Sequence, residues 1–304
     1  MIEVLHAGLC DLVMDQGRPG RAALGVPAGG AADPAALAAA NRLVGNDTAA
    51  AGLEIVLQGP ALRFARGGVV ALVGAVFAAT RSSGAALAWN ETLVLAVGET
   101  LHLGQARTGC RCWLAVGGGV AAPLVMGSRS TFLPAGFGGH LGRALQTGDE
   151  LLSGSQCEAI RLLRAHSPVP APAGAPLRVV AGPQAGQFDD AGLAAFFSGT
   201  YRVSAASDRR GLRLRGPKIG HVPEDLRSQG VLPGVVQVPP DGQPIILGWD
   251  GPVTGGYPVI AAIVTADLPR LAQLRTGDAV RFETVELARA RALAAAHWKI
   301  EELA

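Results

Sequence analysis

Short apolar runs separated by turn residues recur along the whole chain, and they predict a mainly β protein. The runs are rich in β-branched residues and are bounded by glycine, proline or charged residues. This pattern is typical of strands in a compact sandwich or barrel. The predicted strands cover residues 2–6, 53–57, 62–64, 69–73, 87–89, 93–97, 101–103 and 113–116 in the first half, and residues 177–181, 201–203, 235–238, 245–247 and 259–264 in the second.

Only a few segments have a helical pattern. The alanine-rich residues 35–43 predict a short helix, with Asp33 as its N-cap and Pro34 at its first position. A second short helix is predicted around Leu193. The last segment, residues 286–304, has helical propensity and places its apolar residues on roughly one face. We therefore expect a mainly β fold with a few short helices.

Two features divide the chain into two domains. A turn of glycine followed by an acidic residue opens an alternating strand near the end of each half, which suggests two related β-barrels. The copies of this turn lie in residues 97–103, 147–152 and 276–282. Residues 166–176 are rich in proline and alanine and predict a stiff linker. We place an N-terminal domain at residues 1–165 and a C-terminal domain at residues 177–304.

The densest group of candidate functional side chains follows a predicted hairpin in the second half. Residues 239–242 read Pro-Pro-Asp-Gly, which favours a tight turn between two strands. Asp250, Thr254, the Gly255-Gly256 backbone and Tyr257 then follow in one irregular loop. Loops held on rigid strands commonly carry functional groups. A wide glycine turn with Tyr257 packed over it is the structural alternative.

A second candidate group surrounds Arg129. Ser128, Ser130 and Thr131 flank this arginine, and the set could bind a carboxylate or an oxyanion. Alternatively, the hydroxyls cap their own backbone. His140 lies in the glycine-rich segment that follows, and nothing in the sequence pairs it with a nucleophile, so a catalytic triad is not predicted. The three arginines of residues 207–214 predict an exposed charged hairpin or a binding site.

Composition excludes several classes of function. The 304 residues carry a net charge of only +2, with 16% charged residues, and show no basic patch typical of nucleic-acid or membrane-surface binding. No apolar run reaches the roughly 18 residues that a membrane span needs, so we expect a cytoplasmic protein. Cys110 and Cys112 have no matching second pair, and we predict no metal site. The Gly117–Gly119 run lacks the residues of a phosphate-binding loop.

Several segments together resemble one known family. They read GSRST, GGHLGRALQTGD, SDRRGLRLRGP and VVQVPPDGQPIIL followed by TGGYP. In order and spacing they are similar to the family of the 5-oxoprolinase C subunit, which is also called KipA-like, allophanate hydrolase subunit 2 or biotin-dependent carboxyltransferase. The resemblance covers nearly the whole chain. It implies two cyclophilin-like β-barrel domains, a KipI-like B subunit and an A subunit as partners, and ATP-dependent hydrolysis of 5-oxo-L-proline to L-glutamate by the assembled subunits.

The family resemblance also implies a site in a cleft between the two barrels. Arg129 and the amides of Gly255 and Gly256 would stabilise negative charge on the substrate oxygen, and Asp33 or Asp250 would transfer protons. ATP would be shared with the partner subunits, because this chain has no phosphate-binding loop. The expected catalytic residues are Asp33, Arg129 and Asp250, and the expected substrate-binding residues are Asn41, Ser130, Gln237, Thr254, Gly255, Gly256 and Tyr257.

The chain departs from the family pattern at a few positions. Met14 replaces a glutamine, Arg210 replaces a methionine, and residues 29–32 and 251–253 lack the usual hydroxyl and amide groups. Two alternative functions remain open. One is a carboxyltransferase that moves a carboxyl group from carboxybiotin to urea or a similar small amide, with the biotin carried on another chain. The other is a regulator without chemistry that binds a KipI-like kinase inhibitor.

Overall fold

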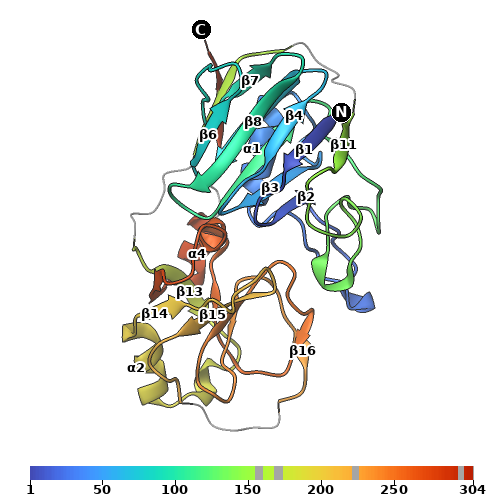
Figure 1. The fold of residues 1–304 in the computed structure, drawn as a ribbon. Helices are drawn as coiled ribbons and strands as arrows, with labels where there is room; N and C mark the ends of the chain where they lie inside the picture. The colour runs from blue at the N-terminus through green and yellow to red at the C-terminus, as the bar shows by residue number, and fades with distance from the viewer. Residues whose placement is uncertain (155–159, 168–173, 221–225, 294–297, 304) are drawn as a thin grey trace. The chain divides into compact units, whose positions relative to one another are not determined.

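The computed structural model describes residues 1–154, 160–167, 174–220, 226–293 and 298–303 (Figure 1). The chain forms two compact units. Unit 1 contains Met1–Arg18, Gly29–Pro168 and His297–Ala304, and unit 2 contains Pro19–Ala28 and Val169–Ala296. Each unit has its own hydrophobic core. The predicted mainly β fold with a few short helices is confirmed.

Unit 1 is built from two antiparallel sheets that share one core. The six-stranded sheet has the order β10-β11-β1-β4-β8-β6, and the five-stranded sheet has the order β2-β3-β9-β5-β7. Inward-facing residues of both sheets, such as Leu62 and Leu114, belong to the same buried cluster. The strands are β1 (Ile2–His6), β2 (Asp11–Met14), β3 (Gly52–Val56), β4 (Ala61–Phe64), β5 (Gly68–Gly74), β6 (Phe77–Arg81), β7 (Thr92–Leu95), β8 (Glu99–Ala106), β9 (Arg111–Val116), β10 (Val120–Ala121) and β11 (Glu150–Ser153).

Helix α1 (Pro34–Leu43) packs on β5 and β9, so the five-stranded sheet is covered on both faces. Strand β9 is consequently buried along nearly its whole length and is almost entirely apolar. Gly52 permits the close approach of helix to sheet, because a Cβ there would lie 2.9 Å from the Leu37 side chain. The predicted cap is confirmed, since the Asp33 carboxylate accepts a hydrogen bond from the Ala36 amide at 3.0 Å.

Unit 2 is a nearly closed barrel. Its eight-stranded sheet has the order β21-β14-β15-β18-β17-β20-β13-β22, and the two end strands, β21 and β22, are separated along the chain by Arg281 alone. One continuous segment therefore borders both ends of the sheet, as barrel closure requires. The strands are β13 (Leu177–Ala181), β14 (Tyr201–Val203), β15 (Gly211–Arg215), β16 (Gln229–Gly230), β17 (Val235–Gln237), β18 (Ile245–Leu247), β19 (Thr254–Gly255), β20 (Val259–Ile263), β21 (Ala279–Val280) and β22 (Phe282–Thr284).

The helices of unit 2 are short. Helix α2 (Asp190–Ser198) confirms the helix predicted around Leu193 and places Phe196 in the core, stacked on Phe282. Two further α-helices are α3 (Leu268–Leu271) and α4 (Leu287–Leu293). Single 3-10 turns are η1 (Ala22–Leu24), η3 (Ala185–Gln187) and η4 (Thr265–Asp267) in unit 2, and η2 (Leu133–Ala135) in unit 1.

Two local predictions are wrong. Residues 87–89 form no strand, although Leu87, Ala88 and Trp89 do pack against the core of unit 1. In the described part of residues 286–304, α4 is helical, but β23 (Lys299–Glu302) is a strand that pairs with β12 (Leu163–His166) in unit 1. Residues 294–297 and 304 lie outside the described residues. The strand is made by a partner more than 130 positions away in the sequence, and a local propensity argument cannot detect such a partner.

The repeated glycine-acid turn has the same hydrogen bonds in all three copies. Gly98, Gly148 and Gly277 have φ values of 78°, 92° and 90°, a conformation that glycine adopts without strain. The acidic residue that follows accepts a hydrogen bond from the backbone amide three positions before it, at 2.8 Å for Glu99, 2.7 Å for Asp149 and 2.8 Å for Asp278. The repeat predicted from sequence is thus a repeated turn, present before β8 and β11 in unit 1 and before β21 in unit 2.

Candidate functional site

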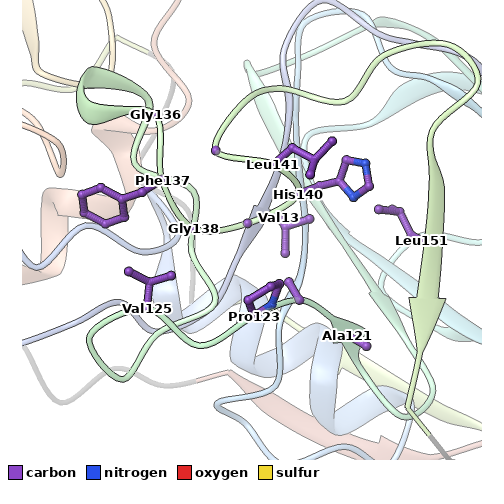
Figure 2. A pocket seen from close by; sticks show the side chains of 13 residues that line it. Val13, Ala121, Pro123, Val125, Gly136, Phe137, Gly138, His140, Leu141 and Leu151 are labelled. Atoms are coloured by element: carbon purple, nitrogen blue, oxygen red, sulfur yellow. The ribbon is translucent and has the colours of Figure 1, made fainter.

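Unit 1 contains a pocket of about 280 Å³ with a mostly apolar lining (Figure 2). Figure 2 shows Phe137 and Val125 on one side of the pocket and His140, Leu141 and Leu151 on the other. The described residues that line it include no Asp, Glu, Lys or Arg. The lining consists of Val13, Ala121, Ala122, Pro123, Val125, Gly136, Phe137, Gly138, Gly139, His140, Leu141, Gly142 and Leu151.

The loop beside this pocket is held in place by the buried carboxylate of Asp15. Its two oxygens accept hydrogen bonds from the hydroxyls of Ser128 and Ser130, both at 2.6 Å. They also accept from the backbone amides of Arg129 at 2.5 Å and Gly17 at 2.8 Å. Four donors therefore converge on one acceptor group from two segments more than 100 residues apart. Asp15 directly follows the last residue of β2, so these hydrogen bonds attach the GSRST loop (residues 127–131) to the end of that strand.

Arg18 forms a second part of this support. Its side chain is 1% exposed, its Nη2 donates to the Ser130 carbonyl at 2.5 Å, and its guanidinium lies 5.0 Å from the centre of the Phe137 ring. A guanidinium over an aromatic face is an attractive cation–π contact. Arg18 thereby connects the Asp15 cluster to Phe137, a wall of the pocket.

The glycine-rich segment after Phe137 requires its glycines. Gly138 and Gly139 have φ values of 73° and 54°. A Cβ at Gly139 would overlap the hydroxyl of Thr131, which cannot simply swing away because it donates to the Val13 carbonyl at 3.0 Å. This loop therefore has little freedom to accept side chains, and the pocket wall depends on its backbone conformation.

Replacing Gly139 with alanine should destabilise unit 1 by about 2–4 kcal/mol, because positive-φ strain and a buried clash add together. Gly136→Ala is the matched control. Gly136 has a similar φ of 64°, but a Cβ there would meet nothing within 4 Å, so only about 1 kcal/mol of strain is expected. Urea denaturation of both variants checks this, and equal losses would contradict the proposed clash.

Arg129 lies beside the pocket, and its own groups are partly used by the protein. Its Nη1 donates to the carbonyl of Ala122, a lining residue, and its own carbonyl accepts from the Gly139 amide at 2.9 Å. Ser130 is fully buried with its hydroxyl on Asp15, and neither residue is part of the lining. In these contacts both residues support the pocket wall, and their predicted contact with substrate stays a prediction.

Asp33 and Asn41 have structural partners in unit 1. Burial raises the pKa of Asp33 to about 6, and the amides at the start of α1 oppose this effect. The Asn41 side chain is fully buried and donates to the Ala50 carbonyl at 2.7 Å, while it accepts from Asn46 at 3.0 Å. Asn41 therefore fixes the loop after α1. The expected roles of both residues in catalysis or binding are untested.

The TGGYP loop lies in unit 2, where the predicted hairpin is confirmed by pairing of β17 with β18. Thr254 and Gly255 form β19, which pairs with β16. Gln237 is buried, and its amide nitrogen lies 3.4 Å from the Tyr257 carbonyl. A Cβ at Gly255 would overlap this same amide. Thr254, Gly256 and Tyr257 are exposed, with Tyr257 at 46%, so this loop presents polar groups to solvent.

Asp250 forms a buried ion pair in unit 2. Its Oδ2 lies 2.8 Å from Nε of Arg209, and its Oδ1 lies 3.2 Å from Nη2. Both side chains are nearly inaccessible. The prediction that the arginines of residues 207–214 lie on an exposed hairpin is therefore wrong for Arg209. A carboxylate with both oxygens bound by a guanidinium can accept a proton only if the ion pair is broken. The geometry therefore favours a structural role for Asp250, as the partner that fixes Arg209.

Sequence reasoning gave no functional role to two titratable residues of unit 1, His140 and Asp11. His140 lines the pocket, and its Nε2 lies 3.4 Å from Oδ1 of Asp149. Asp149 was recognised only as a turn residue. Asp11 is fully buried on β2, and desolvation raises its pKa to about 7, opposed by a hydrogen bond from the Gly8 amide. The available signal for Asp11 was a carboxylate directly before the apolar run Leu12-Val13-Met14.

The described residues contain no group of three or more His, Cys, Asp or Glu side chains placed to hold a metal ion. None of the helices that the structure describes is long and apolar enough to cross a membrane. The cleft predicted between the two barrels stays a prediction.

Comparison with known proteins gives consistent results. A family model described as "Carboxyltransferase domain, subdomain A and B" matches residues 24–284. The 5-oxoprolinase C subunit of Escherichia coli is 39% identical, covering 93% of this chain and 90% of that protein, and its Haemophilus influenzae namesake is 34% identical over 96% and 94%. The crystal structure of the Kluyveromyces lactis urea amidolyase matches with a TM-score of 0.87 and 32% identity, covering 95% of this chain but 19% of that one. The chain therefore belongs to the carboxyltransferase-domain family that includes the C subunit of 5-oxoprolinase.

Proposed function

We propose that the chain is the C subunit of an ATP-dependent 5-oxoprolinase, which hydrolyses 5-oxo-L-proline to L-glutamate together with A and B subunits. The observation that carries this proposal is sequence identity of 39% and 34% to two proteins that are named as 5-oxoprolinase C subunits. The chain covers 90% and 94% of two relatives that are named as C subunits of 5-oxoprolinase. It covers only 19% of the urea amidolyase chain, in which the equivalent domain is one part of a larger polypeptide.

The chemistry of lactam hydrolysis fits such a division of labour. A lactam carbonyl is stabilised by amide resonance, and ATP can activate it by phosphorylating the oxygen. The sequence has no phosphate-binding loop, so ATP would be handled mainly by the partner subunits. This chain would contribute a small apolar pocket for the ring, and preorganised donors near it would stabilise developing negative charge.

A carboxyltransferase function is the second candidate. It is favoured by the description of the matching family model and by the structural similarity to a urea amidolyase. In this case the chain would move a carboxyl group from carboxybiotin on another polypeptide to urea or a similar small amide. A regulator that binds a KipI-like kinase inhibitor remains an untested third prediction.

Reconstitution with the A and B subunits tests the proposal. We expect glutamate and inorganic phosphate to form from 5-oxo-L-proline and ATP only when all three chains are present. The control omits this chain and keeps the other two. Urea-dependent loss of carboxybiotin from a biotin carrier protein, without release of glutamate from 5-oxo-L-proline, would favour the carboxyltransferase instead.

A further inference from the structure

His140 is the one titratable side chain among the described residues that line the pocket of unit 1. Figure 2 shows its imidazole near Leu141 and Leu151, within the apolar lining. The side chain is 22% exposed, so it is accessible to a ligand without lying free in solvent. A pocket with this lining suits the small, uncharged ring of a ligand whose charged groups stay outside the lining, because a charged group would lose its hydration there without a charged partner.

Asp149 orients this imidazole. Its carboxylate is held by two hydrogen bonds from the Arg143 guanidinium, at 2.7 and 2.8 Å, and by the Gln146 amide at 2.7 Å. The Arg143 guanidinium is the main reason that the pKa of Asp149 lies far below its usual range. Asp149 is thus ionised at neutral pH and can act only as an acceptor.

The tautomer of His140 follows from this contact. Nε2 lies 3.4 Å from Oδ1 of Asp149, so this carboxylate favours the neutral tautomer that carries its proton on Nε2. In the neutral imidazole, Nδ1 is then the acceptor. Among the residues that the structure describes, none makes a hydrogen bond to Nδ1. An imidazole that is fixed by a carboxylate through one nitrogen and open at the other is arranged as a general base.

We propose that His140 is the acid–base residue for lactam opening in this pocket, with Asp149 as its positioning residue and the uncharged ring of a cyclic amide as the bound group. This inference rests on the proposed 5-oxoprolinase function. It differs from the assignment of Asp33 or Asp250 as the proton carrier, because those carboxylates are used as a helix cap and in a buried ion pair.

The proposed step begins with the lactam activated as its O-phosphoryl derivative by ATP. Water forms a bond to the carbonyl carbon while Nδ1 of His140 takes its proton. The imidazolium returns this proton to the ring nitrogen as the C–N bond breaks, and the remaining hydroxyl proton passes to the freed amine as the carbonyl reforms. The product is an acyl phosphate, which a second water hydrolyses to the carboxylate and inorganic phosphate.

The first test is His140→Gln in the complex with A and B subunits, assayed for glutamate release from 5-oxo-L-proline and ATP. We expect kcat to fall about 10²- to 10⁴-fold, the usual contribution of a general acid–base residue, while KM changes little. His102→Gln is the matched control, because His102 is an exposed histidine on β8 of the same unit, and it should keep wild-type rates. Equal rates for the two variants in an active complex would overturn the role of His140 and leave the proposed function standing.

The second test separates positioning by Asp149 from a merely structural role. Without the carboxylate, the imidazole loses the group that fixes its orientation, so Asp149→Asn should lower kcat of the assembled complex while KM changes little. A purely structural role would reduce the amount of assembled complex and leave kcat per complex unchanged, and that result would contradict the positioning role.

The third test measures binding without turnover. In the full-length chain with ¹⁵N-labelled histidine, 2-pyrrolidinone should shift the Nδ1 resonance of His140 and leave that of His102 unchanged. If the Nδ1 resonance of His140 does not move as 2-pyrrolidinone is titrated in, the pocket assignment is overturned. If the wild-type complex releases no glutamate at all, both the proposed function and this inference fail, which distinguishes that case from failure of His140 alone.

Discussion

Replacing Asp15 with alanine is expected to destabilise unit 1 by about 3–5 kcal/mol, the range for removing one partner of a buried charged network. The carboxylate accepts hydrogen bonds from Ser128, Ser130, Arg129 and Gly17. Its removal leaves several buried donors without an acceptor, and each such group costs about 1–3 kcal/mol. The loss of free energy of unfolding can be measured by urea denaturation.

The control for Asp15→Ala is a pair of single serine variants. Ser128→Ala removes one of the donors together with its hydrogen bond and leaves the carboxylate in place, so about 1–2 kcal/mol is expected. Ser130→Ala should behave similarly. If Asp15→Ala costs no more than either serine variant, the carboxylate is not the centre of this network. The pocket should also be lost, because the same network holds the 128–130 loop against β2.

The second large effect concerns Asp11 and pH. Asp11 is fully buried on β2, and no described residue makes a hydrogen bond to its Oδ1. Desolvation raises its pKa from 3.8 to about 7 in the folded protein. The folded state therefore binds this proton more tightly than the unfolded state, and the stability contributed by Asp11 falls as pH rises from about 4 to 7. The maximum slope for one proton is about 1.4 kcal/mol per pH unit.

Asp11→Asn should remove this dependence. The asparagine cannot ionise, so its stability relative to wild type should increase between pH 4 and pH 7 and stay constant above pH 8. A constant loss of about 1–3 kcal/mol from burying the new amide group is compatible with this result, because the prediction concerns the slope. Urea denaturation at several pH values provides the measurement.

Glu150→Gln is the control for Asp11→Asn. Glu150 is an exposed carboxylate in the same unit, so Glu150→Gln removes a carboxyl group without changing a buried one. The difference in free energy of unfolding between wild type and Asp11→Asn could instead stay constant from pH 4 to 8. That result would show that Asp11 is hydrated or ionised in the folded protein, contrary to its burial. Asp33, whose pKa is also raised, is unchanged in both variants and cancels in the comparison.

Local sequence signals predicted those elements whose causes are themselves local. Helix α1 begins where Asp33 and Pro34 provide a cap and a first turn, and the β17–β18 hairpin follows from the turn at residues 239–242. The repeated glycine-acid turns could be recognised because both their conformation and their capping hydrogen bond lie within four residues. Strand β23 could not be predicted, because its partner β12 lies far away in the sequence.

In the candidate site, too, local signals were visible in the sequence and distant contacts were not. The sequence singled out Arg129 and Ser130 as candidate residues, but it could not show that the Ser130 hydroxyl donates a hydrogen bond to Asp15, 115 positions away. The sequence also marked Asp149 as a turn residue and His140 as a loop residue. That the two side chains meet at the pocket depends on how the loop between them folds back, which residue types alone do not reveal.

The amino-acid sequence by itself determined the family, the mainly β architecture and most strand positions, because hydrophobic alternation and turn residues act over a few neighbouring positions. Only the tertiary structure decided which polar side chains are available for chemistry. A buried donor or acceptor must find a partner, and distant segments supply most of these partners here. Asp250 and Ser130 are thereby held in internal contacts, whereas His140 lines the pocket of unit 1.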